Sequence, residues 1–318
     1  MKPKISVVIP VYNEENALDV CYKTVSDVLK SIDYSYEIVF VDDGSRDKSA
    51  NMLRDFSMKD ECVKTVLLSR NFGKESALSA GIDFSEGEAV IILDADLQDP
   101  PELIPDMIKV WQEKNVDVVL MKRKSRSGES YTKKLTANIF YKVINYVSYF
   151  HIPEQVGDFR LMSRKAVNAL KKLPERNRYM KGLFAWIGMD SYVMEYDRDP
   201  RVSGEAKMNY MKLINLAIEG ITSFSITPLR FAVVFGIFTA IFGFGFGLWI
   251  VFKTLIIGES VRGYASTISI ITFLGGIQLL TIGIVGEYIG KIYIESKQRP
   301  NYLIKELIAK GKNDESNF

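Results

Sequence analysis

The chain has 318 residues, enough for one catalytic domain of ordinary size and a smaller part beside it. Its 41 Lys and Arg residues against 39 Asp and Glu residues give a formal net charge of +2, so charge gives no indication of a nucleic-acid partner. The two cysteines, Cys21 and Cys62, lack metal-ligand spacing, which favours reduced thiols in a reducing compartment. Mean hydropathy is +0.02 although 25% of residues are charged, because apolar residues concentrate in 231–290.

Short apolar runs alternate with helical patterns along the first 121 residues. The runs are rich in Val, Ile and Leu, and they are Ile5–Ile9, Glu37–Val41, Val63–Leu68, Ala89–Leu93 and Val116–Met121. The helical patterns between them are 15–31, 47–57, 74–85 and 102–114. Apolar runs without clean alternation are typical of strands buried on both faces of a parallel sheet. The predicted fold class is therefore α/β, an open and mostly parallel sheet with flanking helices.

The beginning of the chain favours a cytoplasmic domain. Residues 1–4 are followed by only a short apolar stretch before Pro10, too short for the apolar core of a signal peptide. We interpret this stretch as the first strand and expect the N-terminal domain to stay in the cytoplasm.

Polar residues gather directly after three of the predicted strands. They form the clusters Pro10–Glu14, Asp42–Ser45 and Asp94–Gln98. In open α/β sheets, ligands bind outside the carboxyl ends of the strands. The sequence therefore predicts an active site along one edge of one sheet.

The Asp94-Ala95-Asp96 triplet indicates a divalent metal. Its two carboxylates follow a buried strand, and a turn there would let both reach one point. Paired hard oxygens suit Mg²⁺ or Mn²⁺, especially where a substrate diphosphate completes the shell. Acidic pairs are also common in ordinary loops, so the two other polar clusters are what make this interpretation specific.

Two long apolar segments predict a transmembrane hairpin at about 231–252 and 265–287. The first holds 22 residues without a charge, about 33 Å as a helix, which matches a bilayer core. The alternative, a buried core helix, is harder to reconcile with uncharged runs of this length. Arg230 precedes the hairpin and Lys291, Lys297 and Arg299 follow it, so we expect both ends on the cytoplasmic side. Glycines in both segments would allow close helix packing, and we expect a homo-oligomer.

Two further stretches, Lys133–Phe150 and Lys207–Ile226, have an apolar stripe at helical spacing. A cationic amphipathic helix can lie in the headgroup plane of a membrane, but packing against the domain's own core explains the pattern equally well. The predicted organisation is a cytoplasmic catalytic domain over 1–206, juxtamembrane helices over 207–229, the hairpin over 230–290 and a cytoplasmic tail over 291–318.

Six motifs together resemble a known family. The segments Ile5–Glu14, Val41–Ser45 and Asp94–Gln98 resemble the inverting glycosyltransferases of family 2. The segments Ser69–Lys74, Gly157–Arg160 and Arg201–Lys207, with the hairpin, are similar to the polyprenyl-phosphate glycosyltransferase subgroup, which includes dolichol-phosphate mannose synthase and bactoprenol glucosyltransferases. The resemblance covers Ile5 to about Leu303 and implies a GT-A type fold.

The resemblance implies a role for each motif residue. The uracil and ribose of a donor would be held by Pro10, Tyr12, Glu14, Asp42 and Asp43. The metal that bridges the donor diphosphate would be held by Asp94, Asp96 and Gln98. A mobile loop would clamp the donor diphosphate or the lipid phosphate through Arg201 and Lys207, since a guanidinium fork and an ammonium both suit phosphate oxygens. An ordinary surface or turn role is the alternative for each of these residues.

Asp158 occupies the position of the catalytic base that the resemblance implies. A hydroxyl acceptor must lose a proton on attack, but a lipid phosphate is already ionised at neutral pH. Asp158 could instead orient the acceptor, hold Arg160 or contact the sugar. Two other residues carry weak signals: the single histidine, His151, is expected to be structural or capping, and Gly73-Lys74 lacks the rest of a phosphate-loop pattern.

The resemblance implies an enzyme that moves a hexose from a nucleotide sugar to undecaprenyl phosphate, with glucose from UDP-glucose as the leading donor. N-acetylglucosamine, mannose and aminoarabinose are alternative sugars. A processive polysaccharide synthase is a second alternative, although its Gln-x-x-Arg-Trp motif and extra spans do not appear in the sequence. A membrane scaffold with a decayed transferase domain is a third, and the intact acidic residues argue against it. We expect a multi-pass protein of the inner membrane.

Overall fold

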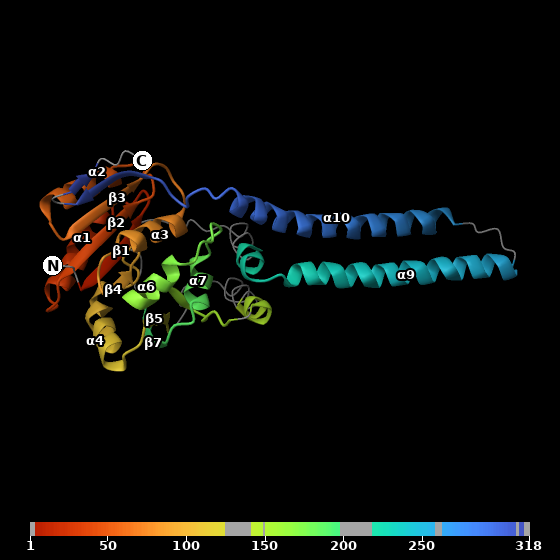
Figure 1. The fold of residues 1–318 in the computed structure, drawn as a ribbon, viewed down its shortest axis with the longest axis horizontal. Coiled ribbons are helices and arrows are strands. Elements are labelled where there is room, and N and C mark those ends of the chain that lie inside the picture. Colours follow the sequence, from red (N-terminus) through yellow and green to blue (C-terminus); the bar gives the residue numbers. More distant parts are fainter. Residues whose placement is uncertain are drawn as a thin grey trace.

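The computed structural model describes residues 4–124, 141–148, 150–197, 218–257, 263–309 and 312–314 (Figure 1). They form an α/β domain that contains the sheet and a long helical hairpin that projects from it.

The sheet has nine strands in the order β7-β5-β6-β4-β1-β2-β3-β8-β9. Their bounds are β1 Ile5–Val11, β2 Tyr36–Asp42, β3 Val63–Leu68, β4 Ala89–Ile92, β5 Val118–Arg123, β6 Val156–Ser163, β7 Ser191–Tyr196, β8 Ile304–Ala309 and β9 Lys312–Asp314. Strand β1 pairs in parallel with β2 and β4, and β2 pairs in parallel with β3. Strand β6 is antiparallel to both of its neighbours, β4 and β5. The sheet is thus mixed, with a parallel centre.

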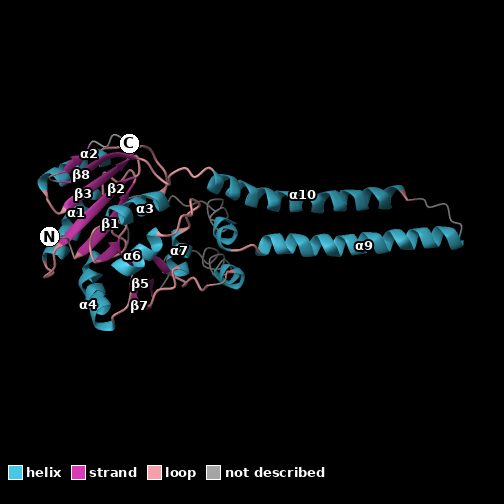
Figure 2. Ribbon diagram, viewed as in Figure 1, coloured by secondary structure: helices cyan, strands magenta, loops and turns pink. Residues whose placement is uncertain are grey.

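Helices cover both faces of this sheet (Figure 2). Their bounds are α1 Leu18–Lys30, α2 Ser49–Lys59, α3 Lys74–Phe84, η1 Pro101–Leu103, α4 Ile104–Lys114, α6 Arg164–Lys171 and α7 Met180–Trp186. Buried side chains of α1, α2 and α4 pack on one face, and those of α3, α6 and α7 pack on the other. Consecutive strand residues alternate between these two cores; Val7, for example, belongs to the first and Val8 to the second. Burial on both faces explains the continuous apolar runs in the sequence.

The five predicted strands are present as β1 to β5, and the four helical patterns as α1 to α4. The structure differs from the expected tail over 291–318. Helix α10 continues to Ser296, and β8 pairs antiparallel with β3, with Thr65 opposite Ile308. A salt bridge connects β8 to helix α2, with Arg54 Nη2 lying 2.8 Å from Glu306 Oε2. The chain therefore returns from the hairpin to complete the sheet, covering an edge of β3 that would otherwise be unpaired.

The hairpin consists of α9, Thr227–Ile257, and α10, Tyr264–Ser296, which lie side by side and extend away from the sheet domain (Figure 1). Both are long and apolar enough to cross a membrane, with mean hydropathies of 2.2 and 2.1 over their candidate spans. Almost none of these side chains is buried inside the protein. Exposed apolar helices of this length are typical of a membrane-associated segment.

The base of the hairpin is tied to the sheet domain by polar contacts. The Glu295 carboxylate accepts hydrogen bonds from the backbone N–H groups of Arg176 at 2.8 Å and Asn177 at 3.1 Å. The Tyr288 hydroxyl donates to the backbone carbonyl of Ser225 at 2.6 Å. These contacts anchor the α7 side of the domain beside the start of the hairpin.

The first predicted amphipathic stretch is described only in part. Residues 141–147 are helical, and Tyr141 and Ile144 are buried in a small core with Ile152 and Tyr179. This part packs against the protein's own domain, although Tyr146 is 86% exposed. Residues 133–140 and 207–217 lie outside the described residues.

Candidate active site

The loops that follow β1 and β2 are joined by hydrogen bonds at the carboxyl edge of the sheet. The backbone N–H of Asn13 donates to the Ser45 hydroxyl at 2.9 Å, and the Asn13 side chain accepts from the Arg46 N–H at 2.8 Å. The Glu14 N–H donates to the Ser49 hydroxyl at 3.0 Å. Asn13 has φ 54, a left-handed conformation that asparagine tolerates better than most residues. The loops therefore hold the predicted donor-binding residues in a fixed arrangement.

Asp42 lies at the end of β2 with 2% of its surface exposed. One carboxylate oxygen, Oδ2, accepts the Ser45 N–H at 3.1 Å. The other, Oδ1, is buried and has no hydrogen-bond partner among the described residues. Burial is the main cause that raises the pKa of Asp42. A buried acceptor without a partner costs free energy that a ligand donor could recover. Among the other predicted donor residues, Pro10 pairs with Val41 within the sheet and Tyr12 is 38% exposed.

Asp43 organises the loop after β3. Its carboxylate accepts the backbone N–H groups of Phe72 at 2.7 Å and Gly73 at 2.9 Å. Gly73 has φ 96, which side-chain-bearing residues rarely adopt, and it directly precedes helix α3. Gly44 at φ 66 lets this loop approach, because a Cβ there would clash with the backbone of Arg70. The structure thus gives Asp43 an anchoring role that fixes where α3 begins.

Lys74, the first residue of α3, bridges two carboxylates from different strands. Its Nζ lies 2.7 Å from Asp94 Oδ1, just after β4, and 2.7 Å from Asp158 Oδ2, near the start of β6. Burial disfavours the ammonium charge, but Asp158 and Asp94 together outweigh it and raise the pKa of Lys74. The ammonium therefore holds the middle of the site together.

The two carboxylates that share this ammonium differ in their pKa directions. Burial raises the pKa of Asp94 beyond what Lys74 offsets. Burial also disfavours ionisation of Asp158, but Lys74, then Lys181 and Arg160, hold its pKa well below the ordinary range. The additional cations near β6 account for the difference. Asp158 is thus an ionised group with a poor tendency to take up a proton.

Asp96 completes the acidic triplet after β4. Its Oδ1 accepts the Gln98 N–H at 3.2 Å across a turn in which Leu97 has φ 52. Burial, followed by the charges of Asp96, Asp94 and Glu14 in that order, raises the pKa of the Cys21 thiol to about 12. These carboxylates therefore lie around the same thiol on helix α1. The structure thus brings Glu14, Asp94 and Asp96 near one another.

The acidic triplet and Gln98 offer oxygen ligands for a divalent cation. Carboxylates and an amide oxygen are the hard ligands that Mg²⁺ and Mn²⁺ prefer. Among the described residues, no group of three or more His, Cys, Asp or Glu side chains is arranged to hold a metal. Asp94 and Asp96 thus fit a cation whose remaining ligands come from elsewhere, as diphosphate oxygens would supply.

Arg201 and Lys207 lie outside the described residues, so their predicted clamp stays a prediction. Lys74 belongs to the Ser69–Lys74 motif, but no role at the site was predicted for it. A signal was present, because Ser69–Lys74 follows β3 at the same sheet edge as the three clusters already identified. Its contact with Asp158 spans 84 positions and requires the fold.

Residues 6–171 match glycosyl transferase family 2, and residues 227–292 match the GtrB C-terminal hairpin. The chain is 51% identical over 302 residues to a bactoprenol glucosyl transferase of Shigella phage SfV, covering 95% of this chain and 98% of that one. It is 48% identical over 307 residues to an uncharacterized glycosyltransferase of Synechocystis sp., covering 96% of both chains.

A mannosyltransferase from Pyrobaculum calidifontis, solved with GDP-Man and Mn²⁺, has a similar arrangement with a TM-score of 0.49 and 14% identity, covering 91% of this chain and 88% of that one. The family match covers more than half of this chain, and the relatives match it almost end to end. The chain belongs to glycosyl transferase family 2 and is a glycosyltransferase with a two-helix, membrane-associating hairpin.

Proposed function

We propose that this enzyme transfers glucose from UDP-glucose to the phosphate of a polyprenyl lipid such as undecaprenyl phosphate. One observation carries the proposal: Asp42, Asp94 and Asp158 stand at one edge of the sheet on β2, after β4 and on β6, in that spatial order. The edge thus offers places for a nucleoside, a diphosphate and an acceptor in sequence. Relatives named bactoprenol glucosyl transferase, at about 50% identity over 95% of the chain, support the lipid acceptor and the sugar.

The donor base and ribose would lie between the loops after β1 and β2. The unpartnered Asp42 Oδ1 suits an N–H or hydroxyl donor, such as the imide of uracil or a ribose hydroxyl. Pro10, Tyr12 and Glu14 would line the same place. Asp43, whose carboxylate is bonded to Phe72 and Gly73, would act by holding the loop rather than by touching the donor.

Asp94, Asp96 and Gln98 would hold Mg²⁺ or Mn²⁺, which would neutralise the charge that develops on the departing diphosphate. Arg201 and Lys207 would add positive charge to the donor diphosphate or the lipid phosphate. The Lys74 ammonium keeps Asp94 in place.

Asp158 would position cationic groups at the reaction centre. It is held ionised beside Lys74, and the acceptor phosphate has no proton to lose, so no base is demanded. An oxygen of the lipid phosphate forms a bond to C1 of glucose while the bond from C1 to the diphosphate oxygen breaks, and the electron pair leaves with UDP. Alignment of the attacking oxygen and stabilisation of the leaving group account for the rate acceleration. A single displacement inverts C1 and gives a β-linked product from an α-linked donor.

The hairpin would place this edge next to the membrane that holds the acceptor. Contacts of Glu295 and Tyr288 support a fixed position of the domain on the hairpin. We further propose that the domain lies on the cytoplasmic side of the inner membrane, and that the open glycine positions of α9 and α10, such as Gly243 and Gly276, pack against other copies.

Incubating membranes that contain the protein with labelled UDP-glucose and undecaprenyl phosphate tests the proposal. We expect a metal-dependent, mild-acid-labile glycolipid, and Asp94→Ala or Asp96→Ala abolishes it while the protein stays folded in the membrane. Transfer from UDP-N-acetylglucosamine, GDP-mannose or an aminoarabinose donor, but not from UDP-glucose, would show that the donor sugar is not glucose. A long polymer would indicate a polysaccharide synthase, and no transfer from any donor would overturn the assignment.

A further inference from the structure

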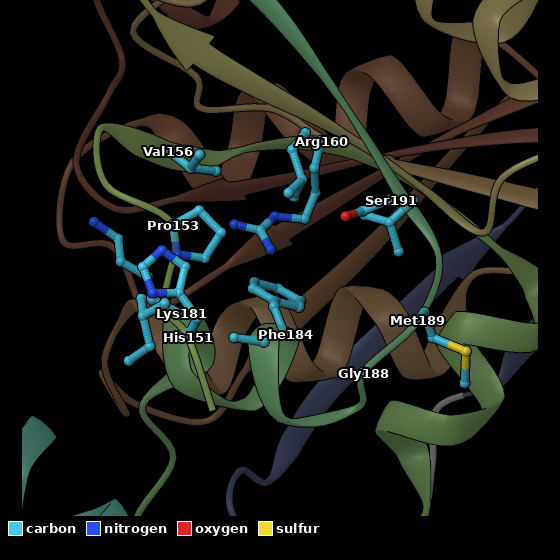
Figure 3. Close-up of a pocket in the computed structure, with 13 residues that line it drawn as sticks. His151, Pro153, Val156, Arg160, Lys181, Phe184, Gly188, Met189 and Ser191 are labelled. Carbon is cyan, nitrogen blue, oxygen red and sulfur yellow. The ribbon is translucent and has the colours of Figure 1, made fainter. Parts of the chain in front are cut away.

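A small cavity lies on the far side of Asp158 from the donor site, between β5, β6 and α7 (Figure 3). Its volume is about 110 Å³. Its walls come from β5 and β6, helix α7 and two loops, and include Val156, Arg160, Lys181, Phe184 and His151. Pockets that enclose a whole drug-sized ligand measure roughly 300–1,000 Å³. This cavity accommodates a headgroup and has no room for a nucleotide sugar.

The Arg160 guanidinium, 4% exposed, faces this cavity. It stacks on the ring of Phe184, with its central carbon 3.9 Å from the ring centroid. Its hydrogen bonds go to backbone carbonyls, those of Gly157 at 2.6 Å and Asp158 at 3.3 Å. No carboxylate in the described part of the chain forms an ion pair with it. The charges of Asp158 and Glu75 act on this buried guanidinium without a direct ion-pair contact, and an anion in contact with it would stabilise it further.

Two more nitrogen-bearing side chains line the cavity. Figure 3 shows His151 and Lys181 on one side of the Arg160 guanidinium and Ser191 and Met189 on the other. The charge of Lys181 reaches Asp158, whose pKa it helps to lower, so the cavity adjoins the reaction centre. The remaining wall is apolar. This combination suits an anion that carries an apolar body.

The strand order places the cavity relative to the predicted donor residues. Along the carboxyl edge the order is β2, β1, β4, β6 and β5, so the donor residues on β2 and after β4 lie on one side of Asp158 and the cavity lies on the other. Asp42 and Asp94 would be occupied by the donor. The cavity is therefore placed beside Asp158 on the side away from the donor residues, where a second substrate would reach the site.

We propose that this cavity is the acceptor-phosphate subsite, in which Arg160, Lys181 and His151 receive the phosphate and Phe184 and Val156 contact the first isoprene unit. The inference rests on the proposed function for the identity of the acceptor. It assigns Arg160 and Lys181 to binding, and it explains why a charged residue is tolerated inside β6. The bound phosphate would supply the direct ion-pair contact that Arg160 does not have with the described carboxylates, whose charges act on it without contact.

Binding of farnesyl phosphate to the purified full-length protein, without donor, tests this directly. Arg160 is buried and its removal could unfold the domain, so half-buried Lys181 carries the test. We expect Lys181→Gln to raise the Kd for farnesyl phosphate about tenfold, the effect of losing one charge-assisted hydrogen bond. The matched control Lys172→Gln, on an exposed lysine at the end of α6, leaves that Kd unchanged. Farnesol and inorganic phosphate, each holding half of the ligand, bind at least about tenfold more weakly than farnesyl phosphate.

A second variant fills the cavity without removing charge. Ala185→Phe, at a lining position on α7, should weaken farnesyl phosphate binding while UDP-glucose binding stays within twofold of the original. An unchanged Kd for farnesyl phosphate in both variants overturns the subsite, as does an equal loss of UDP-glucose binding. Failure of the proposed function is a separate result, because it appears as absent glucosyl transfer by the unaltered protein, whatever the binding measurements give.

Discussion

Replacing Lys74 by methionine removes one ammonium and leaves Asp94 and Asp158 without their shared counter-ion. Methionine keeps most of the length of the side chain, so the change is chiefly one of charge. Removing one partner from a fully buried ion pair costs about 3–5 kcal/mol. Lys74 is 45% exposed and Asp94 24%, so water screens the two carboxylates and reduces this cost. We expect about 1–2 kcal/mol, which lowers the Tm of a domain of this size by about 2–8 °C.

Lys74→Met should reduce kcat by more than its loss of folding stability can explain. Without the ammonium, Asp94 and Asp158 repel each other, and the group that holds the two carboxylates together is gone. We expect kcat for glucosyl transfer to fall about 100-fold or more, comparable with removal of one stabilising donor from an active site. Lys74→Arg, which keeps the charge, should recover part of kcat.

Lys64 provides the matched control. It also bridges two carboxylates, Glu37 at 3.0 Å and Glu86 at 3.3 Å, but at the opposite edge of the sheet. Lys64→Met should lower Tm at least as much, because Lys64 and Glu37 are less exposed than Lys74 and Asp94, and should leave kcat within twofold. A Lys74→Met enzyme with normal kcat, or equal losses of kcat in both variants, would refute the organising role of Lys74.

Two further predictions concern stability. Burial, then the charge of Asp158, raises the pKa of Glu75 from 4.5 to about 7. The folded state therefore holds this proton more tightly than the unfolded chain, and stability falls as pH rises from 4.5 to 7. In denaturant titrations, Glu75→Gln should remove this slope and add at most about 3 kcal/mol at pH 8; an unchanged slope contradicts the assignment. Deleting 304–318 exposes the edge of β3 and breaks the Arg54 to Glu306 ion pair. Light scattering should show a lower onset temperature for aggregation, and an unchanged onset would mean that β8 does not protect that edge.

Sequence periodicity predicts the centre of this sheet well because each central strand is apolar on both faces. Strands β1 to β4 lie between two cores, so their residues form continuous apolar runs that few other structures explain. Strand β6 carries Asp158 and Arg160 and therefore has no such run. Strand β7, with three of its six residues exposed in succession, gives no burial pattern to recognise. Strand β8 pairs with β3 across more than two hundred residues, and that separation hides it from local patterns.

The candidate site was likewise only partly predictable from the sequence. Asp42, Asp94 and Asp96 follow predicted strands, so a rule about strand ends is sufficient to group them. The contacts that turn this group into a site are long-range: Asp43 positions the loop that delivers Lys74, and Lys74 reaches Asp158. The role of Asp43 as an anchor could not be inferred from its neighbour Gly44, which suggests only a turn.

Strand β6 runs antiparallel to its neighbours in the middle of the sheet, and this direction places its charged residues at the candidate site. A strand parallel to β4 would end at the carboxyl edge, and the residues after it would serve the site. Because β6 runs the other way, its first residues lie at that edge, and Asp158 and Arg160, two positions apart, share one face. On that face α3 supplies Lys74 to the first, and α7 supplies Phe184 to the second. Reversal of one strand thus places an anion beside the donor and a cation beside the proposed acceptor within three residues of chain.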